Sequence, residues 1–181
     1  MAANSHTSTC FTAIANDDAH ILVLGSMPGV ESLNQQRYYA HPRNAFWPII
    51  TTILELEAGL SYQQRCASLI ANKIALWDVL QSCQRQGSLD SNIEPETIIV
   101  NNFTAFLQQH PALKVIVFNG AKAEQIFNKY VLPTLSENQL TITRKRLPST
   151  SPAHAAISFQ QKCVCWQQLL REYVGLDYVL R

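Results

Sequence analysis

The sequence predicts an α/β fold with three layers, α/β/α, and a mostly parallel central sheet of about four strands. Short, continuous apolar runs alternate with segments of helical periodicity, which is typical of a parallel sheet covered by helices on both faces. The length of 181 residues fits a single domain over 1–181. Hydrophobic residues make up 47% and charged residues only 15% of the chain, which favours a packed core over disorder.

The first predicted strand is the apolar run 21–24, which ends at Gly25. We expect a polar loop over 25–43 and a loosely ordered segment over 1–19. Helices are predicted at 44–57, where apolar side chains recur at helical spacing, and from about 61 to 72, where Ser61 is a suitable N-cap.

The remaining elements follow the same alternation of apolar runs and amphipathic segments. In order, they are a strand at 74–79, a polar loop at 81–92, a helix at about 97–109, a strand at 114–118, a helix at about 121–131, a strand at 140–147 and a helix at about 158–174. Ligands of such folds bind beyond the carboxyl ends of the strands. Three loops are expected there: 25–43, 119–122 and 148–154. The role of loop 81–92 stays open.

Composition excludes several classes of function. The net charge of +1 excludes binding to nucleic acids or membranes through bulk charge alone. No apolar run approaches the roughly 20 residues of a membrane span, and the N-terminus does not resemble a secretory signal. We therefore expect a cytoplasmic protein with no membrane partner. The five cysteines are scattered, so we expect reduced thiols, no iron–sulfur cluster, no metal and no cofactor.

The first motif is the turn that follows the first strand. Gly25 and Gly29 allow the backbone to approach a ligand closely, and Pro28 fixes φ and removes one donor. Backbone N–H groups around Ser26 and Met27 can then face a planar polar group. The pattern is not a dinucleotide or phosphate loop, and Met27 stands where a nucleophile elbow carries serine. Taken alone, such a turn is more often purely structural, and that interpretation stays open.

The second motif is rich in aromatic and amide side chains. Tyr38 or Tyr39 could stack on a flat base. Asn44 offers both a donor and an acceptor, which suits it either to hold a water molecule or to cap the following helix. His41 fits a base, a phosphate contact or a hydrogen-bonded loop histidine.

The third motif is Pro148-Ser-Thr-Ser-Pro-Ala-His154, which follows three basic residues at 144–146. Hydroxyls and backbone N–H groups suit a DNA phosphate, and nearby cations add affinity. Strand alternation would point Arg144 and Arg146 to one side and Lys145 to the other. A solvated turn beside a solvated basic face is the alternative.

Taken together, these motifs resemble the uracil-DNA glycosylase superfamily, most of all its hypoxanthine-DNA glycosylase branch and next its mismatch-specific uracil/thymine branch. The matching segments are Leu24-Gly-Ser-Met-Pro-Gly29, Tyr38-Tyr-Ala-His-Pro-Arg-Asn-Ala-Phe-Trp47 and Pro148-Ser-Thr-Ser-Pro-Ala-His154, with further likeness at 76–79, 87–93 and 119–123. The resemblance spans about 21–166. It implies a uracil-DNA glycosylase-like fold and a monofunctional enzyme that hydrolyses the N-glycosidic bond of deaminated bases, hypoxanthine first, to initiate base excision repair.

The resemblance also assigns site residues. Mismatch-specific enzymes carry a catalytic asparagine where this chain has Met27, whereas the hypoxanthine branch places it at the position of Asn44, which becomes the expected catalytic residue. Tyr39 becomes the expected stacking partner. The expected base-binding residues are Gly25, Ser26, Met27, Pro28, Gly29, Tyr39, His41 and Phe46. The expected DNA-binding residues are Lys122, Arg144, Arg146, Ser149, Ser151 and His154.

Two alternatives remain from the sequence. One is a glycosylase for uracil or mismatched thymine, and the other is a non-catalytic nucleic-acid-binding module with the same fold. A lyase activity would need an activated lysine, and we do not assign that role to Lys122 or Lys145. The expected partner is DNA that contains a deaminated base, bound by a monomer.

Overall fold

The computed structural model of the chain describes residues 7–174. Its main sheet has four strands in the order β3-β2-β6-β7, formed by β2 (Ile21–Gly25), β3 (Ile74–Asp78), β6 (Val115–Asn119) and β7 (Thr143–Leu147). All neighbouring strands are parallel. The predicted four-stranded parallel sheet is therefore confirmed, and the carboxyl ends of its strands lie at one edge.

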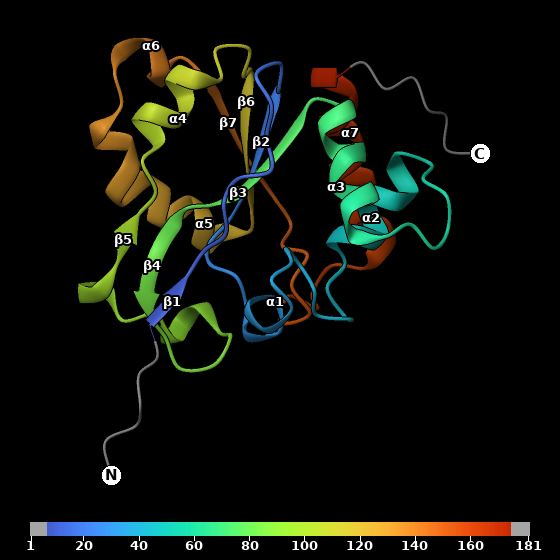
Figure 1. Ribbon diagram of the computed structural model, residues 1–181, viewed down its shortest axis with the longest axis horizontal. Helices are drawn as coiled ribbons and strands as arrows, with labels where there is room; N and C mark the ends of the chain where they lie inside the picture. Colours follow the sequence, from blue (N-terminus) through green and yellow to red (C-terminus); the bar gives the residue numbers. More distant parts are fainter. Residues whose placement is uncertain (1–6, 175–181) are drawn as a thin grey trace.

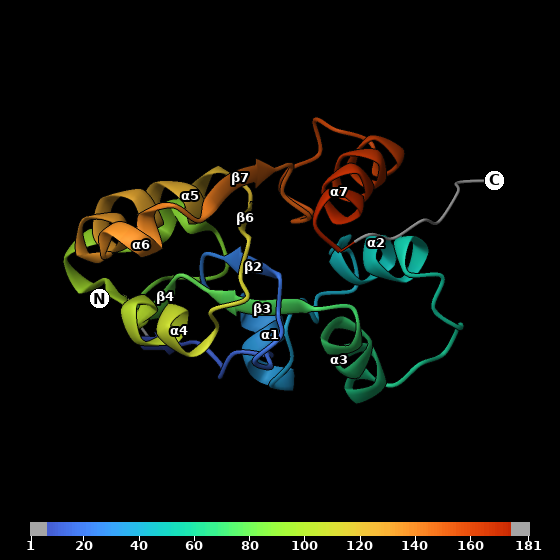
Figure 2. The same cartoon turned by 90° about the horizontal axis from the view of Figure 1, so that it is seen from above.

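Helices cover both faces of this sheet, as Figures 1 and 2 show. On one side lie α4 (Phe103–Gln109), α5 (Ala121–Ile126) and α6 (Glu137–Leu140), and on the other lie α2 (Phe46–Ile53), α3 (Tyr62–Ala71) and α7 (Phe159–Val174). Alternate residues of β2 enter opposite cores: Leu22 and Leu24 face one, Ile21 and Val23 the other. A strand buried on both faces must be apolar throughout, which explains its continuous apolar run.

A second, antiparallel sheet was not predicted. It has the order β1-β4-β5 and comprises β1 (Thr7–Thr9), β4 (Leu80–Gln84) and β5 (Ile99–Val100). The expected polar loop at 81–92 therefore begins as a strand. Leu80 and Cys83 are buried in it, but the polar residues between them hid the pattern in the sequence.

The same sheet corrects the expectation of a loose N-terminal segment. Strand β1 pairs with β4, Ile14 bridges to Leu76, and Ala19 is buried, so residues 7–19 are part of the fold. The part of that expectation that concerns residues 1–6 lies outside the described residues.

Several element boundaries also differ from the prediction. The loop 25–43 contains a short helix, α1 (Val30–Gln35), and the strand expected at 140–147 begins at Thr143 because α6 occupies 137–140. The helix expected at 97–109 starts only at Phe103, after β5. Single helical turns complete the fold at Asp90–Asn92 (η1), Pro95–Thr97 (η2), Phe127–Val131 (η3, a π turn that extends α5) and Leu132–Thr134 (η4).

The predicted cap at Ser61 is confirmed. Its hydroxyl accepts the N–H of Gln64, and the Gln64 side chain accepts the N–H of Ser61 in return, which together start α3. All five cysteines are free. Between residues 7 and 174, no helix has the length and apolar character needed to cross a membrane.

Candidate active site

A cavity of about 490 Å³ opens at the carboxyl ends of the parallel strands. Gly25, Asp78 and Asn119, the last residues of β2, β3 and β6, lie in its wall. Figure 1 shows α1 at this end of the sheet. The three loops expected there do meet around the cavity, and a fourth segment, residues 88–90, joins them.

The turn after β2 presents its backbone to the cavity. A Cβ built on Gly25 would collide with Oδ1 of Asp78 and lie 3.2 Å from the hydroxyl of Tyr39, so only glycine fits there. The Met27 side chain is buried in the core. Within residues 7–174, no backbone or side-chain acceptor takes the N–H of Met27 or of Gly29. These donors are therefore available to a ligand.

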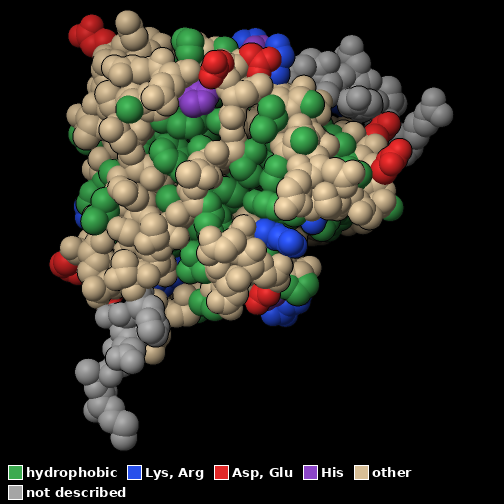
Figure 3. All heavy atoms as spheres, viewed as in Figure 1, with side chains coloured by type: hydrophobic (Ala, Val, Ile, Leu, Met, Phe, Trp, Pro, Cys, Tyr) green, Lys and Arg blue, Asp and Glu red, His purple; other side chains and the backbone are tan. Residues whose placement is uncertain are grey.

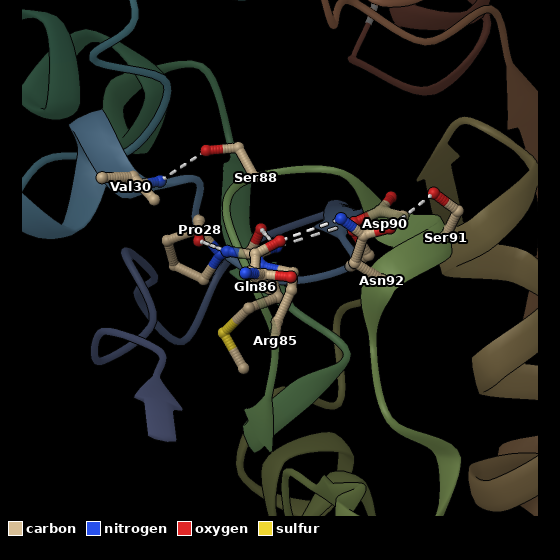
Figure 4. Close-up of polar contacts among 10 residues, drawn as sticks. Pro28, Val30, Arg85, Gln86, Ser88, Asp90, Ser91 and Asn92 are labelled. Carbon is tan, nitrogen blue, oxygen red and sulfur yellow. Dashed lines mark hydrogen bonds and ion pairs between the residues drawn. The ribbon is translucent and has the colours of Figure 1, made fainter. Parts of the chain in front are cut away.

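Arg85, which follows β4, braces this turn from behind, as Figure 4 shows. Its buried guanidinium donates to the carbonyl oxygens of Pro28 and, at 3.5 Å, of Met27. Because a trans peptide points its N–H opposite to its C=O, holding the Pro28 carbonyl turns the Gly29 N–H away from Arg85.

Two further contacts attach the 85–92 segment to the turn. Asp90 lies 3.7 Å from Arg85 and accepts the Ser26 hydroxyl at 2.8 Å, and Ser88 Oγ accepts the N–H of Val30 at 2.9 Å (Figure 4). The loop whose role the sequence left open is thus a support for the turn.

Asp78 forms the floor of the cavity. It is 3% exposed, and its Oδ2 atom has no hydrogen-bond partner in the described part of the chain. Burial, and then the charge of Asp90, raise the pKa of this carboxyl to about 8, while the charge of Arg85 opposes the change. The only sequence signal for a role of Asp78 was its position, because an aspartate at the end of a predicted buried strand is unusual.

Tyr39 lies in the cavity wall and is held there by Phe46. The two rings stack with centroids 4.1 Å apart and planes inclined by 26°. Tyr39 has a positive φ of 55°, which is uncommon for a bulky residue and points to a constrained position. Burial, and then the charge of Asp78, raise the pKa of its hydroxyl. Phe46 itself is fully buried and does not line the cavity, so its expected contact with a base is wrong.

Asn44 combines the two roles that the sequence left open. Its Oδ1 atom accepts the N–H of Phe46 at 3.0 Å, which secures the start of α2, and the residue also lines the cavity. Its own N–H donates to the His41 carbonyl at 2.8 Å. The Nδ1 atom of His41 accepts the N–H of Arg43 at 3.1 Å, so a neutral His41 ring carries its proton on Nε2.

The loop 148–154 is fastened to the cavity through Thr150. Asn119 accepts the Thr150 N–H and donates to its hydroxyl, both at 2.8 Å, and the Thr150 carbonyl accepts the N–H of Ala45 at 2.9 Å. Gly120 has a φ of 102°, and a Cβ there would lie 2.8 Å from that of Ser149. The structural roles of Asn119 and Thr150 were not predicted. Ser149, Ser151 and His154 line the cavity, and their expected contacts with DNA stay predictions.

The three cations expected to bind DNA, Lys122, Arg144 and Arg146, differ in their position relative to the cavity. Lys122 lines the cavity. Arg146 pairs with Glu124 at 3.0 Å and its side chain is 55% exposed. Arg144 bonds to the carbonyls of Leu140 and Ile142 near the start of β7, roughly three strand residues, or about 10 Å, from the carboxyl end. The structure therefore separates Arg144 from the cavity.

Charge is sparse elsewhere as well. On the face shown in Figure 3, the Lys and Arg side chains are few and scattered. No group of three or more His, Cys, Asp or Glu residues within 7–174 is arranged to hold a metal ion.

Known proteins with similar sequences or folds identify the family of this chain. Residues 12–172 match the family model described as the uracil DNA glycosylase superfamily. A hypoxanthine DNA glycosylase of Methanosarcina acetivorans is 35% identical over 89% of this chain and 96% of its own length. One of Methanosarcina barkeri is 39% identical over 62% of this chain and 71% of its own length.

A solved solution structure from Methanosarcina acetivorans, described as a uracil DNA glycosylase, has a similar fold. Its TM-score is 0.76 at 30% identity, covering 92% of this chain and 98% of that one.

Proposed function

The chain belongs to the uracil DNA glycosylase superfamily and is a DNA glycosylase, and from that premise we propose that it excises hypoxanthine from DNA and so initiates base excision repair. The observation that carries the proposal is the arrangement of Asn44 and Met27. Asn44 is fixed in the cavity wall by its bond to Phe46, while the Met27 side chain is buried in the core. Asn44 is then the asparagine available to act on water.

The first step is extrusion of the damaged nucleotide from the duplex, since the glycosidic bond cannot be reached within the base stack. The extruded base would enter the cavity and lie against Tyr39, whose ring is backed by Phe46. Stacking on an aromatic ring contributes about 1–3 kcal/mol per base. The N–H groups of Met27 and Gly29 would donate to the base and stabilise the negative charge that develops as it leaves.

Asn44 would orient the attacking water. Its Oδ1 atom keeps a second lone pair beyond the one used by the Phe46 N–H, so it can accept a hydrogen bond from water and direct the water oxygen at C1′. The bond from C1′ to the base breaks with its electron pair on the base nitrogen, and the water oxygen bonds to C1′. The proton that this water loses balances the one that the base gains, so the products are the free, neutral base and an abasic site.

The DNA backbone would lie along the rim. Lys122 and the hydroxyls of Ser149 and Ser151, with His154, are placed to meet phosphates beside the extruded nucleotide. We further propose that the enzyme acts as a monomer in the cytoplasm, without an iron–sulfur cluster and without lyase activity.

The experiment is excision from four duplex oligonucleotides, each with one hypoxanthine, uracil, xanthine or G-paired thymine, with protein in excess and abasic product revealed by alkali. Cleavage at hypoxanthine in preference to the others is expected. Cleavage chiefly at uracil would favour the second candidate, a uracil glycosylase, to which the description of the similar solution structure points. No cleavage at hypoxanthine would overturn the proposal.

A further inference from the structure

We propose that Asp78 is a further catalytic residue, which acts as a neutral carboxylic acid at the floor of the cavity and donates its O–H to the departing base. The inference rests on the proposed function and deepens it, because it names the group that meets the polar edge of the base.

The geometry gives Asp78 no other partner. The side chain is 3% exposed, lines the cavity and leaves Oδ2 without a hydrogen bond among the described residues. A buried polar group without a hydrogen-bond partner destabilises the folded state. Only a glycine at position 25 leaves room for this carboxyl, since any side chain there would collide with Oδ1. Because Asp78 lines the cavity, a base that enters would lie beside this carboxyl and could bond to it.

The charges around Asp78 favour its neutral form. The titratable groups that act on it are Asp90, Arg85, Tyr39, Tyr38 and Cys10. The guanidinium of Arg85 is the one cation among them, and Asp90 lies 3.7 Å from it. Burial raises the pKa of Asp90 too, but the Ser26 hydroxyl and the charges of Arg85 and Lys122 favour its ionised form, and its side chain is 37% exposed. Of the two carboxyls, Asp90 has the hydroxyl donor and the ion pair with Arg85, so these contacts favour the negative charge on Asp90 and the proton on Asp78.

A neutral acid suits the departing base. Deamination creates a lactam edge, an N–H beside a C=O, and a carboxylic acid presents the complementary acceptor and donor. A carboxylate would offer two acceptors and would repel the negative charge that develops on the base. A donor held in place toward that charge stabilises the transition state, and removing one such donor typically lowers the rate 10²–10³-fold. A buried aspartic acid kept neutral for such donation is a known device of enzymes.

The test is the single-turnover excision rate on the hypoxanthine duplex from about pH 6 to about pH 9.5, the range in which a general acid of this kind titrates. The wild-type rate should fall about tenfold for each pH unit above about 8, as the donor ionises. In Asp78→Asn an amide N–H replaces the donor, so the rate should stay within about tenfold of wild type and show no fall due to this group. Asp78→Ala should lose about 10²–10³-fold at neutral pH.

Two controls make the assignment specific. Hypoxanthine itself loses a proton in alkali, but a fall due to the base would persist in Asp78→Asn. Asp90→Asn keeps an acceptor for Ser26 but removes the charge that raises the pKa of Asp78. The excision rate of this variant should therefore begin to fall at a lower pH than that of the wild type. Asp18→Asn, an exposed aspartate in the turn before β2, should behave as wild type.

The outcomes are separable. A rate that rises through pH 8 with an inactive Asp78→Asn would identify Asp78 as a base and overturn the inference, as would equal rates for the Asn and Ala variants. Titration of the Asp78 carboxyl by ¹³C NMR reads its protonation without any activity: ionisation below about pH 6 would refute a neutral donor. If hypoxanthine is not excised at all, the proposed function fails, whereas this titration still decides the state of Asp78.

Discussion

Asn119 holds Thr150 with both polar atoms of its side chain: Oδ1 accepts the Thr150 N–H, and Nδ2 donates to the Thr150 hydroxyl, each at 2.8 Å. Nδ2 also donates to the Tyr39 hydroxyl at 3.0 Å. One amide at the end of β6 therefore fixes both the loop 148–154 and the tyrosine of the cavity wall relative to the sheet.

Thr150→Val tests this connection, because valine keeps the shape of threonine and removes the hydroxyl. Thr150 is 1% exposed, so the change leaves the Asn119 amide with one acceptor fewer and should lower the free energy of unfolding by about 1–3 kcal/mol, measured by urea denaturation. Excision should weaken through a higher KM, since the loop loses its anchor. Thr52→Val, on an exposed turn of α2, is the control. Equal stability of the two variants would contradict the role of Thr150.

Asn44→Ala should lower the single-turnover excision rate at least about 100-fold while DNA binding is retained, because no other group would orient the water. The variant also loses a helix-start bond, which costs about 1 kcal/mol. Asn102→Ala removes an equivalent bond at the start of α4, away from the cavity, and is the matched control. Comparable stability losses with excision lost only in Asn44→Ala are expected. Near-normal turnover in Asn44→Ala would remove its assigned role.

Arg85→Met should strongly destabilise the protein, by about 3–5 kcal/mol, because it leaves Asp90 without its cation and the carbonyls of the turn without their donor. Thermal unfolding measures the loss. The double variant Arg85→Met/Asp90→Asn should recover part of the stability but not the excision rate, since the turn remains unbraced. Full recovery of excision would show that the brace does not position the turn.

Asp78→Asn should also change the pH dependence of stability. The pKa of Asp78 is about 8 in the folded protein against 3.8 for an unperturbed aspartate, so the folded state binds the proton more tightly. The stability that this proton contributes is complete below about pH 4 and is lost as the pH rises toward 8. The Tm of Asp78→Asn minus that of wild type should therefore increase from pH 4 to pH 8. A constant difference would show that Asp78 is ionised in the folded protein.

Salt dependence of DNA binding separates the cations. With few phosphate contacts, log K should fall gently with log salt, by about 0.9 for each phosphate neutralised. Lys122→Ala should make this slope shallower by about 0.9, the value for one phosphate contact. Arg144→Ala, near the other end of β7, should leave it unchanged. A steep wild-type slope, or an effect of Arg144 equal to that of Lys122, would contradict the placement of the DNA along the cavity rim.

The parallel sheet could be predicted because its central strands are buried on both faces and must be apolar throughout. Strand β4 could not, because its pairing with β1 and β5 joins segments far apart in the chain and its outward residues are polar. The backbone turn at 25–29, Tyr39 and Asn44 were predicted to line the site, and they do. Their catalytic roles remain predictions.

The supporting residues were harder to foresee. Phe46 was expected to touch the base, but helical phase points it into the core, where it backs Tyr39. Arg85 resembled any arginine of a polar loop, since its burial depends on the turn that it meets across the fold. Asp78 followed an apolar strand with no partner in sequence, and only the packing around it reveals an unsatisfied carboxyl.

The walls of the cavity come from four loops between Gly25 and His154 and its floor from Asp78, so a fragment that lacks any of these segments lacks part of the site. Each wall requires closure of a long loop, and contacts of such high sequence separation form slowly during folding. During refolding, excision activity should therefore recover later than helical content. The time at which activity returns would mark the assembly of the last distant segments.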